Sequence, residues 1–137
     1  MKNKLINFNL LALIFIISSS FSTITDHAQG GKWELLGTKE VNFGIDIDEI
    51  LVTAKEGTFK SIHLKIRRSA LNMHKMTIHF ADGSEQHVEL KNNFRAGSQS
   101  RIIDLEGNNR IIRKVTMWYD TKNYKNRKAL VELWGKH

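Results

Sequence analysis

Two tryptophans, Trp118 and Trp134, occupy positions in the sequence from which their side chains could bind a flat ligand. Each lies in a segment where apolar and polar residues alternate, and each belongs to the series that points away from the core. If the two segments are neighbouring strands, the indole rings and Leu130 form an exposed aromatic platform that would stack on sugar rings. The structural alternative is that a loop or a second sheet covers both rings.

Positive charge is concentrated in the C-terminal third of the chain. Residues 91–137 contain 11 Lys and Arg and 4 Asp and Glu, whereas residues 23–90 contain 8 and 10. A basic face attracts acidic polysaccharides, anionic lipid headgroups or nucleic acid. The alternative is a solvated basic surface that maintains solubility. The contact residues predicted from stacking and charge together are Trp118, Trp134, Arg113, Arg127 and Lys128.

Two clusters contain residues of the types that bind metal ions, but neither has the complete set of ligands. The segment Asp46–Glu49 offers three carboxylates but lacks the remaining ligands of an EF-hand. His79 and His87 are expected to lie diagonally on one outer face of a hairpin, where a metal would need a third ligand such as His63. We interpret the first cluster as the polar start of a strand and the histidines as exposed. No metal site and no cofactor are therefore predicted.

The sequence contains no motif that identifies a catalytic site. It has no Cys, no Gly-x-Ser-x-Gly, no His-Glu-x-x-His and no glycine-rich phosphate loop after a strand. We therefore predict no catalytic residue and expect a binding function. A small secreted hydrolase assembled from dispersed residues is the third hypothesis, after two binding functions described below.

The N-terminus has the three parts of a secretory signal peptide. Lys2 and Lys4 precede the apolar run Leu10–Ile17, and small serines follow it, with cleavage expected after Ser22. The run of 8 residues is far shorter than the roughly 20 that span a bilayer. We expect residues 1–22 to be removed, which leaves no transmembrane span and a periplasmic or secreted protein. An uncleaved signal anchor is the alternative.

The remaining chain alternates with a period of two residues, which is typical of strands that bury one face. Residues 23–31 are polar and form a flexible leader, and residues 32–137 form a single domain. Turns recur about every ten residues, so we predict an all-β fold, an antiparallel β-sandwich or jelly roll of seven or eight strands. The expected buried series are Ile62, Leu64, Ile66; Met76, Ile78, Phe80; Val88, Leu90; Val115, Met117, Tyr119; and Ala129, Val131, Leu133.

One hairpin can be predicted in register. A three-residue loop, Ala81-Asp82-Gly83, pairs Met76 with Val88 and keeps one face of both strands apolar, whereas a two-residue loop turns Val88 outward. The longer loop also places Gly83 where a type I turn with a bulge requires a positive φ. A second turn is predicted at Gly107-Asn108-Asn109, with a cross-strand ion pair among Arg101, Asp104 and Arg110.

Several short stretches of the chain resemble a known family. These are residues 101–115 with Tyr119, the tail 129–135, residues 33–37 and the Ala81-Asp82-Gly83 hairpin. Together they resemble small exported bacterial proteins with a domain of unknown function, DUF2541. The resemblance covers most of the chain after the signal peptide. It implies an all-β domain of the bacterial envelope or exterior, and it implies no activity and no site residue.

These observations predict an exported, non-catalytic binding domain whose ligands are glycans or other anionic molecules. The alternative is a structural or interaction protein of the envelope that docks on another protein through a sheet edge or an apolar patch. Sequence-specific binding of nucleic acid is not expected, because the protein is predicted to be exported.

Overall fold

The computed structural model describes residues 31–41, 47–120 and 128–137, and within them the alternating segments form eight strands. The predicted signal peptide and Arg127 lie outside the described residues, as does the predicted leader apart from Gly31. No helix among the described residues has the length and hydropathy needed to span a bilayer. The strands are β1 (Trp33–Glu40), β2 (Ile47–Leu51), β3 (Ser61–Arg67), β4 (Leu71–Phe80), β5 (Glu85–Phe94), β6 (Ile103–Asp104), β7 (Ile112–Asp120) and β8 (Leu130–Lys136), with a 3₁₀ turn, η1 (Ala54–Glu56), between β2 and β3.

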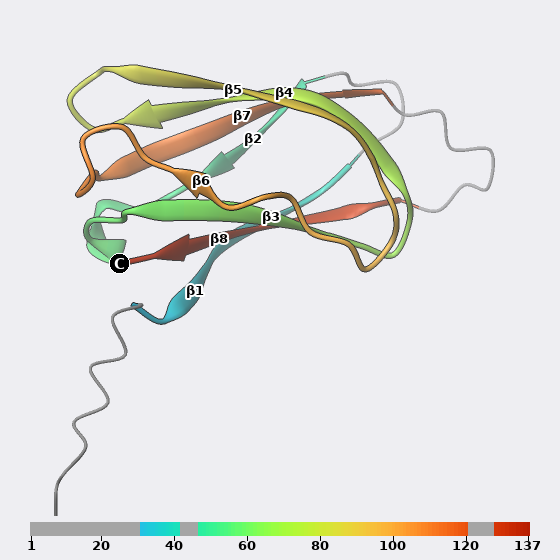
Figure 1. Cartoon of the computed structure of the whole chain (residues 1–137), viewed down its shortest axis with the longest axis horizontal. Helices are drawn as coiled ribbons and strands as arrows, with labels where there is room; N and C mark the ends of the chain where they lie inside the picture. The colour runs from blue at the N-terminus through green and yellow to red at the C-terminus, as the bar shows by residue number, and fades with distance from the viewer. Residues whose placement is uncertain (1–30, 42–46, 121–127) are drawn as a thin grey trace, which may run out of the picture.

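The strands form two four-stranded antiparallel sheets that face each other (Figure 1). We call the sheet β1-β8-β3-β6 the first sheet and the sheet β2-β7-β4-β5 the second sheet. Strand pairs β1/β8, β2/β7, β3/β6 and β4/β5 are nested like the two arms of one long hairpin that has been rolled up. This order is that of a jelly roll, which confirms the predicted fold class.

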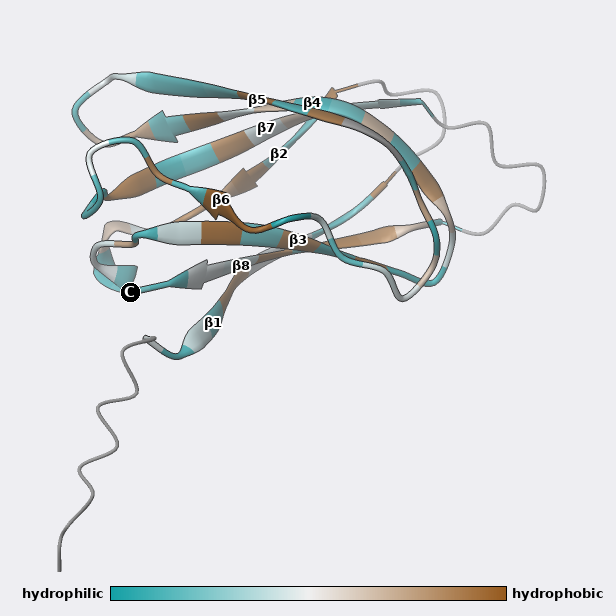
Figure 2. Ribbon diagram, viewed as in Figure 1, coloured by the Kyte–Doolittle hydropathy of each residue, from teal (hydrophilic) through white to brown (hydrophobic). Residues whose placement is uncertain are grey.

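The core lies between the two sheets and contains the apolar series predicted from the alternation. Ile62, Leu64 and Ile66 of β3 are completely buried, and Val131 and Leu133 of β8 pack in the same layer. Figure 2 shows the resulting alternation of apolar and polar bands along the strands. Each fully buried aliphatic side chain of this kind contributes about 1.5–3 kcal/mol relative to an exposed one. The same alternation therefore sends every second residue to an outer face.

The predicted hairpin register is confirmed. Met76 pairs with Val88, the Phe80 amide donates to the Ser84 carbonyl at 2.9 Å, and Gly83 has φ 89°. The second predicted turn also forms, with Gly107 at φ 87° and Asn108 at φ 66°.

The ion pair predicted among Arg101, Asp104 and Arg110 is wrong. The turn after β6 leads from the first sheet to β7 of the second, and the side chains of Asp104 and Arg110 find different partners. Asp104 accepts a hydrogen bond from Ser61 Oγ at 2.9 Å, and Arg110 pairs with Asp82 at 3.1 Å. Sequence distance across a turn does not reveal such a change of sheet.

Candidate ligand-binding site

The outer face of the first sheet contains a pocket floored by β3. Because Ile62 and Leu64 face the core, His63 and Lys65 point to the outer face. The register places His63 opposite Trp134 and Lys65 opposite Glu132 on the neighbouring strand β8. Two successive outward positions of β3 and one of β8 thus bring an imidazole, an ammonium and an indole together.

A second indole comes from the edge strand β1. A β-bulge at Leu36 shifts the register of β1 against β8, and N-terminal to it Trp33 lies on the same outer face as Trp134. The Trp33 ring packs edge-to-face with the His63 ring at a centroid distance of 4.3 Å. The rings of His63 and Trp134 are nearly parallel, with 6.4 Å between their centroids. Only 7% of the surface of His63 is exposed as a result.

The irregular segment 97–102 forms the remaining wall. It pairs with β3 as an extended chain, through hydrogen bonds from the Ile66 amide to the Ser98 carbonyl and from the Ser100 amide to the Leu64 carbonyl. The Ser100 hydroxyl accepts a further hydrogen bond from the Leu64 amide at 2.9 Å. The pocket is half open to solvent, has a volume of about 230 Å³, and is also lined by Gln99, Ser100 and Ile102.

His63 has an unsatisfied nitrogen in this pocket. Its Nε2 is buried and has no hydrogen-bond partner, a rare condition for a buried polar atom that costs about 1–3 kcal/mol. Burial, followed by the nearby Lys65 ammonium, lowers the pKa of His63 below its ordinary value. The ring is therefore neutral at physiological pH, with one nitrogen as donor and the other as acceptor.

A chain of polar contacts holds the orientation of Trp134. Its indole Nε1 donates to Glu132 at 3.0 Å, and Arg67 pairs with the same carboxylate at 3.5 Å. Lys65 Nζ lies 4.4 Å from the centroid of the Trp134 ring, within the range of a cation–π interaction. The Trp134 ring is therefore positioned before any ligand arrives, which reduces the entropy cost of binding.

Comparison with known proteins places this architecture in a family. A family model described as "Domain of unknown function (DUF2541)" matches residues 9–135. The chain belongs to the DUF2541 family. No curated protein matches it.

The predicted platform of two tryptophans is not present in the DUF2541 domain. Both side chains lie on outer faces, as their parity predicted, but β7 belongs to the second sheet and β8 to the first. Trp118 is consequently on the opposite side of the sandwich from Trp134, where Lys75 Nζ lies 4.8 Å from its ring centroid. Of the two predicted tryptophans, the pocket contains Trp134 alone.

The predicted cationic contacts are also dispersed. Arg113 is exposed on β7 of the second sheet. Lys128, just before β8, pairs with Glu40 at 3.2 Å, and Arg127 lies outside the described residues. The structure therefore does not bring Arg113 or Lys128 into the pocket around Trp134.

Sequence reasoning missed Trp33 and Lys65, and it considered His63 as a metal ligand but not as part of this pocket. The alternation of β3 does place His63 and Lys65 on the outer face, and this was the one indication in the sequence that they could contact a ligand. What the sequence did not show is that segment 97–102 and Trp33 cover that part of β3. The bulge at Leu36 also interrupts the in–out alternation of β1, so the alternation did not show which face Trp33 would occupy.

The candidate metal ligands of the DUF2541 domain are engaged elsewhere. Asp48 is buried and accepts a hydrogen bond from Tyr119, with Lys39 at 3.4 Å, whereas Glu49 points outward to Lys114. Asp46 lies outside the described residues. Among those described, no group of three or more His, Asp or Glu is arranged to hold a metal ion.

The proposed histidine pair is likewise occupied. His79 and His87 lie on the second sheet and share the carboxylate of Glu85, at 3.1 and 3.8 Å. His63, considered as their third ligand, is on the first sheet, so the suggestion that the three could meet at one ion is wrong.

Proposed function

We propose that this domain is an exported, non-catalytic module that binds carbohydrate in the pocket formed by Trp33, His63 and Trp134. The observation that carries the proposal is the unpartnered Nε2 of His63, buried beside an aromatic pocket. A buried polar atom that is left unsatisfied in the free protein is stabilised when a ligand supplies its partner. A sugar hydroxyl can do so with either tautomer of the ring, because it both donates and accepts.

The shape and lining of the pocket support a sugar ring. Indole faces supply apolar stacking area, while Gln99, Lys65 and His63 supply a few directed polar groups. The volume of about 230 Å³ is below the roughly 300–1,000 Å³ of sites for drug-sized ligands, so one ring is the expected occupant.

Nε2 of His63 has almost no exposed surface, and the nearest aromatic ring is that of Trp33. Binding therefore includes a shift of the half-buried Trp33 side chain, a common scale of adjustment.

Export is part of the proposal and has its support in the sequence. Lys2, Lys4 and the apolar run Leu10–Ile17 form a signal peptide that would deliver the domain to the periplasm or the exterior, where glycans are abundant. Processing after Ser22 would be read directly from N-terminal sequencing of the protein recovered from culture fractions.

Titration with saccharides, followed by NMR, tests the binding function. We expect the His63 ring and the Trp134 indole signals to shift, and the Trp134→Ala variant to lose binding. Trp118→Ala is the matched control, because Trp118 also carries a lysine over its ring but lies on the other sheet. Shifts confined to the second sheet, or no shift with any sugar, would contradict the proposal.

A second candidate function is docking on an envelope protein through the edge strand β2. Ile47 and Leu51 are 48% and 70% exposed on this strand, which has β7 as its one neighbour in the second sheet. An exposed apolar edge of this kind can accept a partner strand. This function would be favoured if the domain captures one envelope protein, if the complex persists at high salt, and if the Leu51→Lys variant no longer forms it.

A further inference from the structure

We infer that the sugar recognised in this pocket carries a carboxylate, and that Lys65 binds that carboxylate. The inference rests on the proposed function and specifies its ligand class. Uronic acids, in which a carboxylate replaces the hydroxymethyl group of a hexose, are the simplest members of that class.

Lys65 is a positioned cation without an anionic partner. Its Nζ lies over the Trp134 ring at 4.4 Å and its side chain lines the pocket, yet no described carboxylate lies within 4.0 Å of it. Among the described cations on or beside this face, Arg67 pairs with Glu132 and both Arg68 and Lys128 pair with Glu40. Lys136 resembles Lys65, since it lies over an indole ring, that of Trp33, and no described carboxylate lies within 4.0 Å of it. Lys65 is thus held ready for an anion that the described part of the protein does not supply.

The lining of the pocket is free of acidic residues. The polar side chains in it are those of His63, Lys65, Gln99 and Ser100, and the nearby Glu132 is already bound by Arg67 and by the Trp134 indole. A ligand carboxylate would therefore meet an ammonium and neutral polar groups in the lining, while Arg67 offsets the charge of the neighbouring Glu132. The hydrogen bond from an ammonium to a carboxylate is stronger than the hydrogen bond from an ammonium to a neutral hydroxyl.

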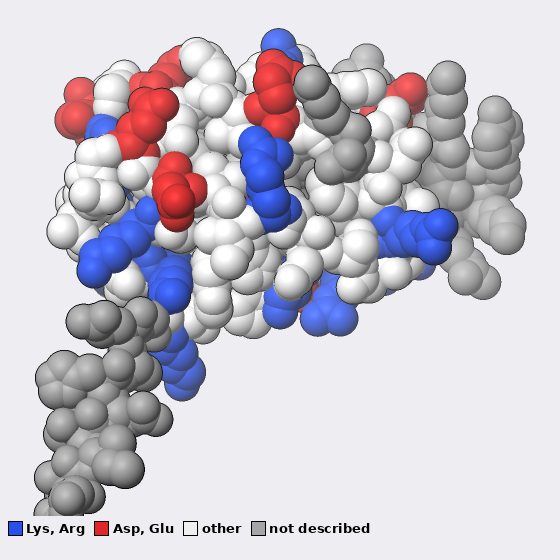
Figure 3. Space-filling model, in the orientation of Figure 1, with Lys and Arg blue, Asp and Glu red and all other residues white. Residues whose placement is uncertain are grey.

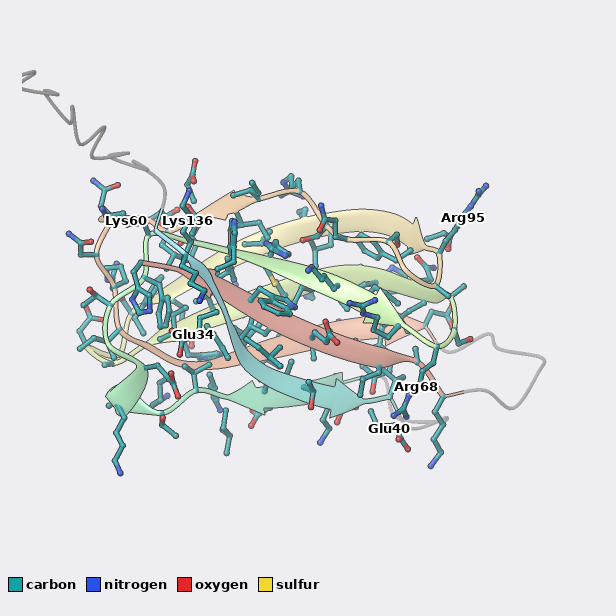
Figure 4. The ribbon with its side chains drawn as sticks, turned by 90° about the horizontal axis from the view of Figure 1, so that it is seen from below. Glu34, Glu40, Lys60, Arg68, Arg95 and Lys136 are labelled. Carbon is teal, nitrogen blue, oxygen red and sulfur yellow. The ribbon has the colours of Figure 1, made fainter. Side chains whose placement is uncertain are left out.

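The distribution of charged side chains also favours the binding of an anion on the outer face of the first sheet. Figure 3 shows most of the visible Lys and Arg side chains on the lower half of the sandwich, towards β3, β8 and β1, and Asp and Glu on the upper half. Figure 4 shows Lys60 and Lys136 together at one end of this face and Arg68 beside Glu40 at the other. Lys136 Nζ lies 5.9 Å from the Trp33 ring centroid, so a second lysine stands next to the pocket. This distribution attracts anionic ligands towards the first sheet.

The test compares sugars that differ only in the carboxylate. D-galacturonate and D-galactose form one matched pair, and D-glucuronate and D-glucose form the other, each titrated into the purified protein by NMR. We expect the acids to bind about tenfold more tightly than their neutral partners, which corresponds to about 1.4 kcal/mol for one charge-assisted contact. The same titration gives a second readout, because a bound carboxylate beside the imidazole raises the pKa of His63.

Lys65→Met is the decisive variant. Methionine keeps an unbranched apolar stem over Trp134 and removes the charge, so we expect the tenfold preference for each acid over its neutral partner to vanish. Lys75→Met is the matched control, since Lys75 lies over Trp118 in the same way on the other sheet. The control variant should keep the full preference.

The outcomes separate this inference from the proposed function. Equal binding of acid and neutral sugars by the unchanged protein overturns the carboxylate and leaves carbohydrate binding intact. A preference that persists in Lys65→Met overturns the role of Lys65. Absence of any shift with all four sugars contradicts both the carboxylate inference and the proposed function.

Discussion

The rings of Trp33 and His63 meet edge-to-face at 4.3 Å, although their strands are separated in the sheet by β8. Trp33 therefore extends over β8 to close the pocket above β3. The contact removes His63 from water without giving its Nε2 a partner. An apolar residue at position 63 would avoid the cost of the unpartnered nitrogen, and the proposed binding role would account for an imidazole in its place.

Replacing His63 tests that trade-off. His63→Phe removes an unsatisfied nitrogen from beside a pocket with space for a larger ring, so we expect the free energy of unfolding to be unchanged or higher by about 1 kcal/mol. Carbohydrate binding should be lost. Urea denaturation measures the first effect and NMR titration the second.

His79 provides the control for this substitution. Its ring nitrogens lie 3.1 Å from Glu85 and 3.0 Å from Thr116, so His79→Phe breaks two contacts and should destabilise the fold by about 1 kcal/mol. A loss of more than about 2 kcal/mol in His63→Phe would mean that the imidazole is a structural residue, and the site would lose its main support.

The pH dependence of stability should report the burial of His63. Because its pKa is lower in the folded than in the unfolded protein, the unfolded state binds the proton first as the pH falls. The contribution of His63 is thus complete above its unfolded pKa of about 6.5 and is lost as the pH falls through that value towards the lower folded one. Denaturation at pH 5.5 and 7.5 should show this loss in the unchanged protein and a smaller loss in His63→Phe. Equal losses would contradict the assignment.

His137 should show the opposite dependence. Its two nitrogens lie 2.8 Å from a Glu34 carboxylate oxygen and 2.8 Å from the Thr58 carbonyl, and an imidazolium can donate to both acceptors at once. The Glu34 carboxylate, followed by the Thr58 carbonyl, raises the pKa of His137, while the hydrogen bond from His137 lowers the pKa of Glu34.

The contribution of His137 is complete below its unfolded pKa of about 6.5 and is lost as the pH rises through the higher folded pKa. We therefore expect His137→Gln to lower the melting temperature at pH 6 more than at pH 9. His87→Gln, at a ring whose side chain is 75% exposed, is the comparison. A decrease for His137→Gln that is independent of pH would show that the ion pair with Glu34 contributes nothing.

We expect that no side chain can be accommodated at Gly135 of β8, which faces the core beneath the pocket. A Cβ atom there would lie 2.7 Å from both Leu36 Cδ1 and Phe59 Cδ1, closer than real contacts allow. Gly135→Ala should destabilise the domain by about 1–3 kcal/mol through overpacking. Lys136→Ala, one residue away and facing outward, should change stability by less than about 0.5 kcal/mol. Comparable losses in the two variants would argue against the packing described for this strand.

The extent to which sequence predicted this structure follows from the range of the interactions. The 81–83 turn and the burial of Ile62, Leu64 and Ile66 depend on neighbouring residues and on parity, and both could be derived. The order of strands depends on contacts between residues far apart, so nothing local showed that Trp118 and Trp134 would face opposite directions. The pocket combines residues 33, 63 and 134 with segment 97–102, and a β-bulge shifts one of them. Trp134 was therefore found and its partners were not.

Determining the structure of the domain soaked with D-galacturonate tests the central claim most directly. The account predicts a sugar ring in the pocket between segment 97–102 and Trp134, with one of its oxygens within hydrogen-bond distance of His63 Nε2 and its carboxylate at Lys65. Sugar bound on the second sheet beside Trp118, or a pocket that stays empty with Nε2 still unpartnered at saturating sugar, would contradict it.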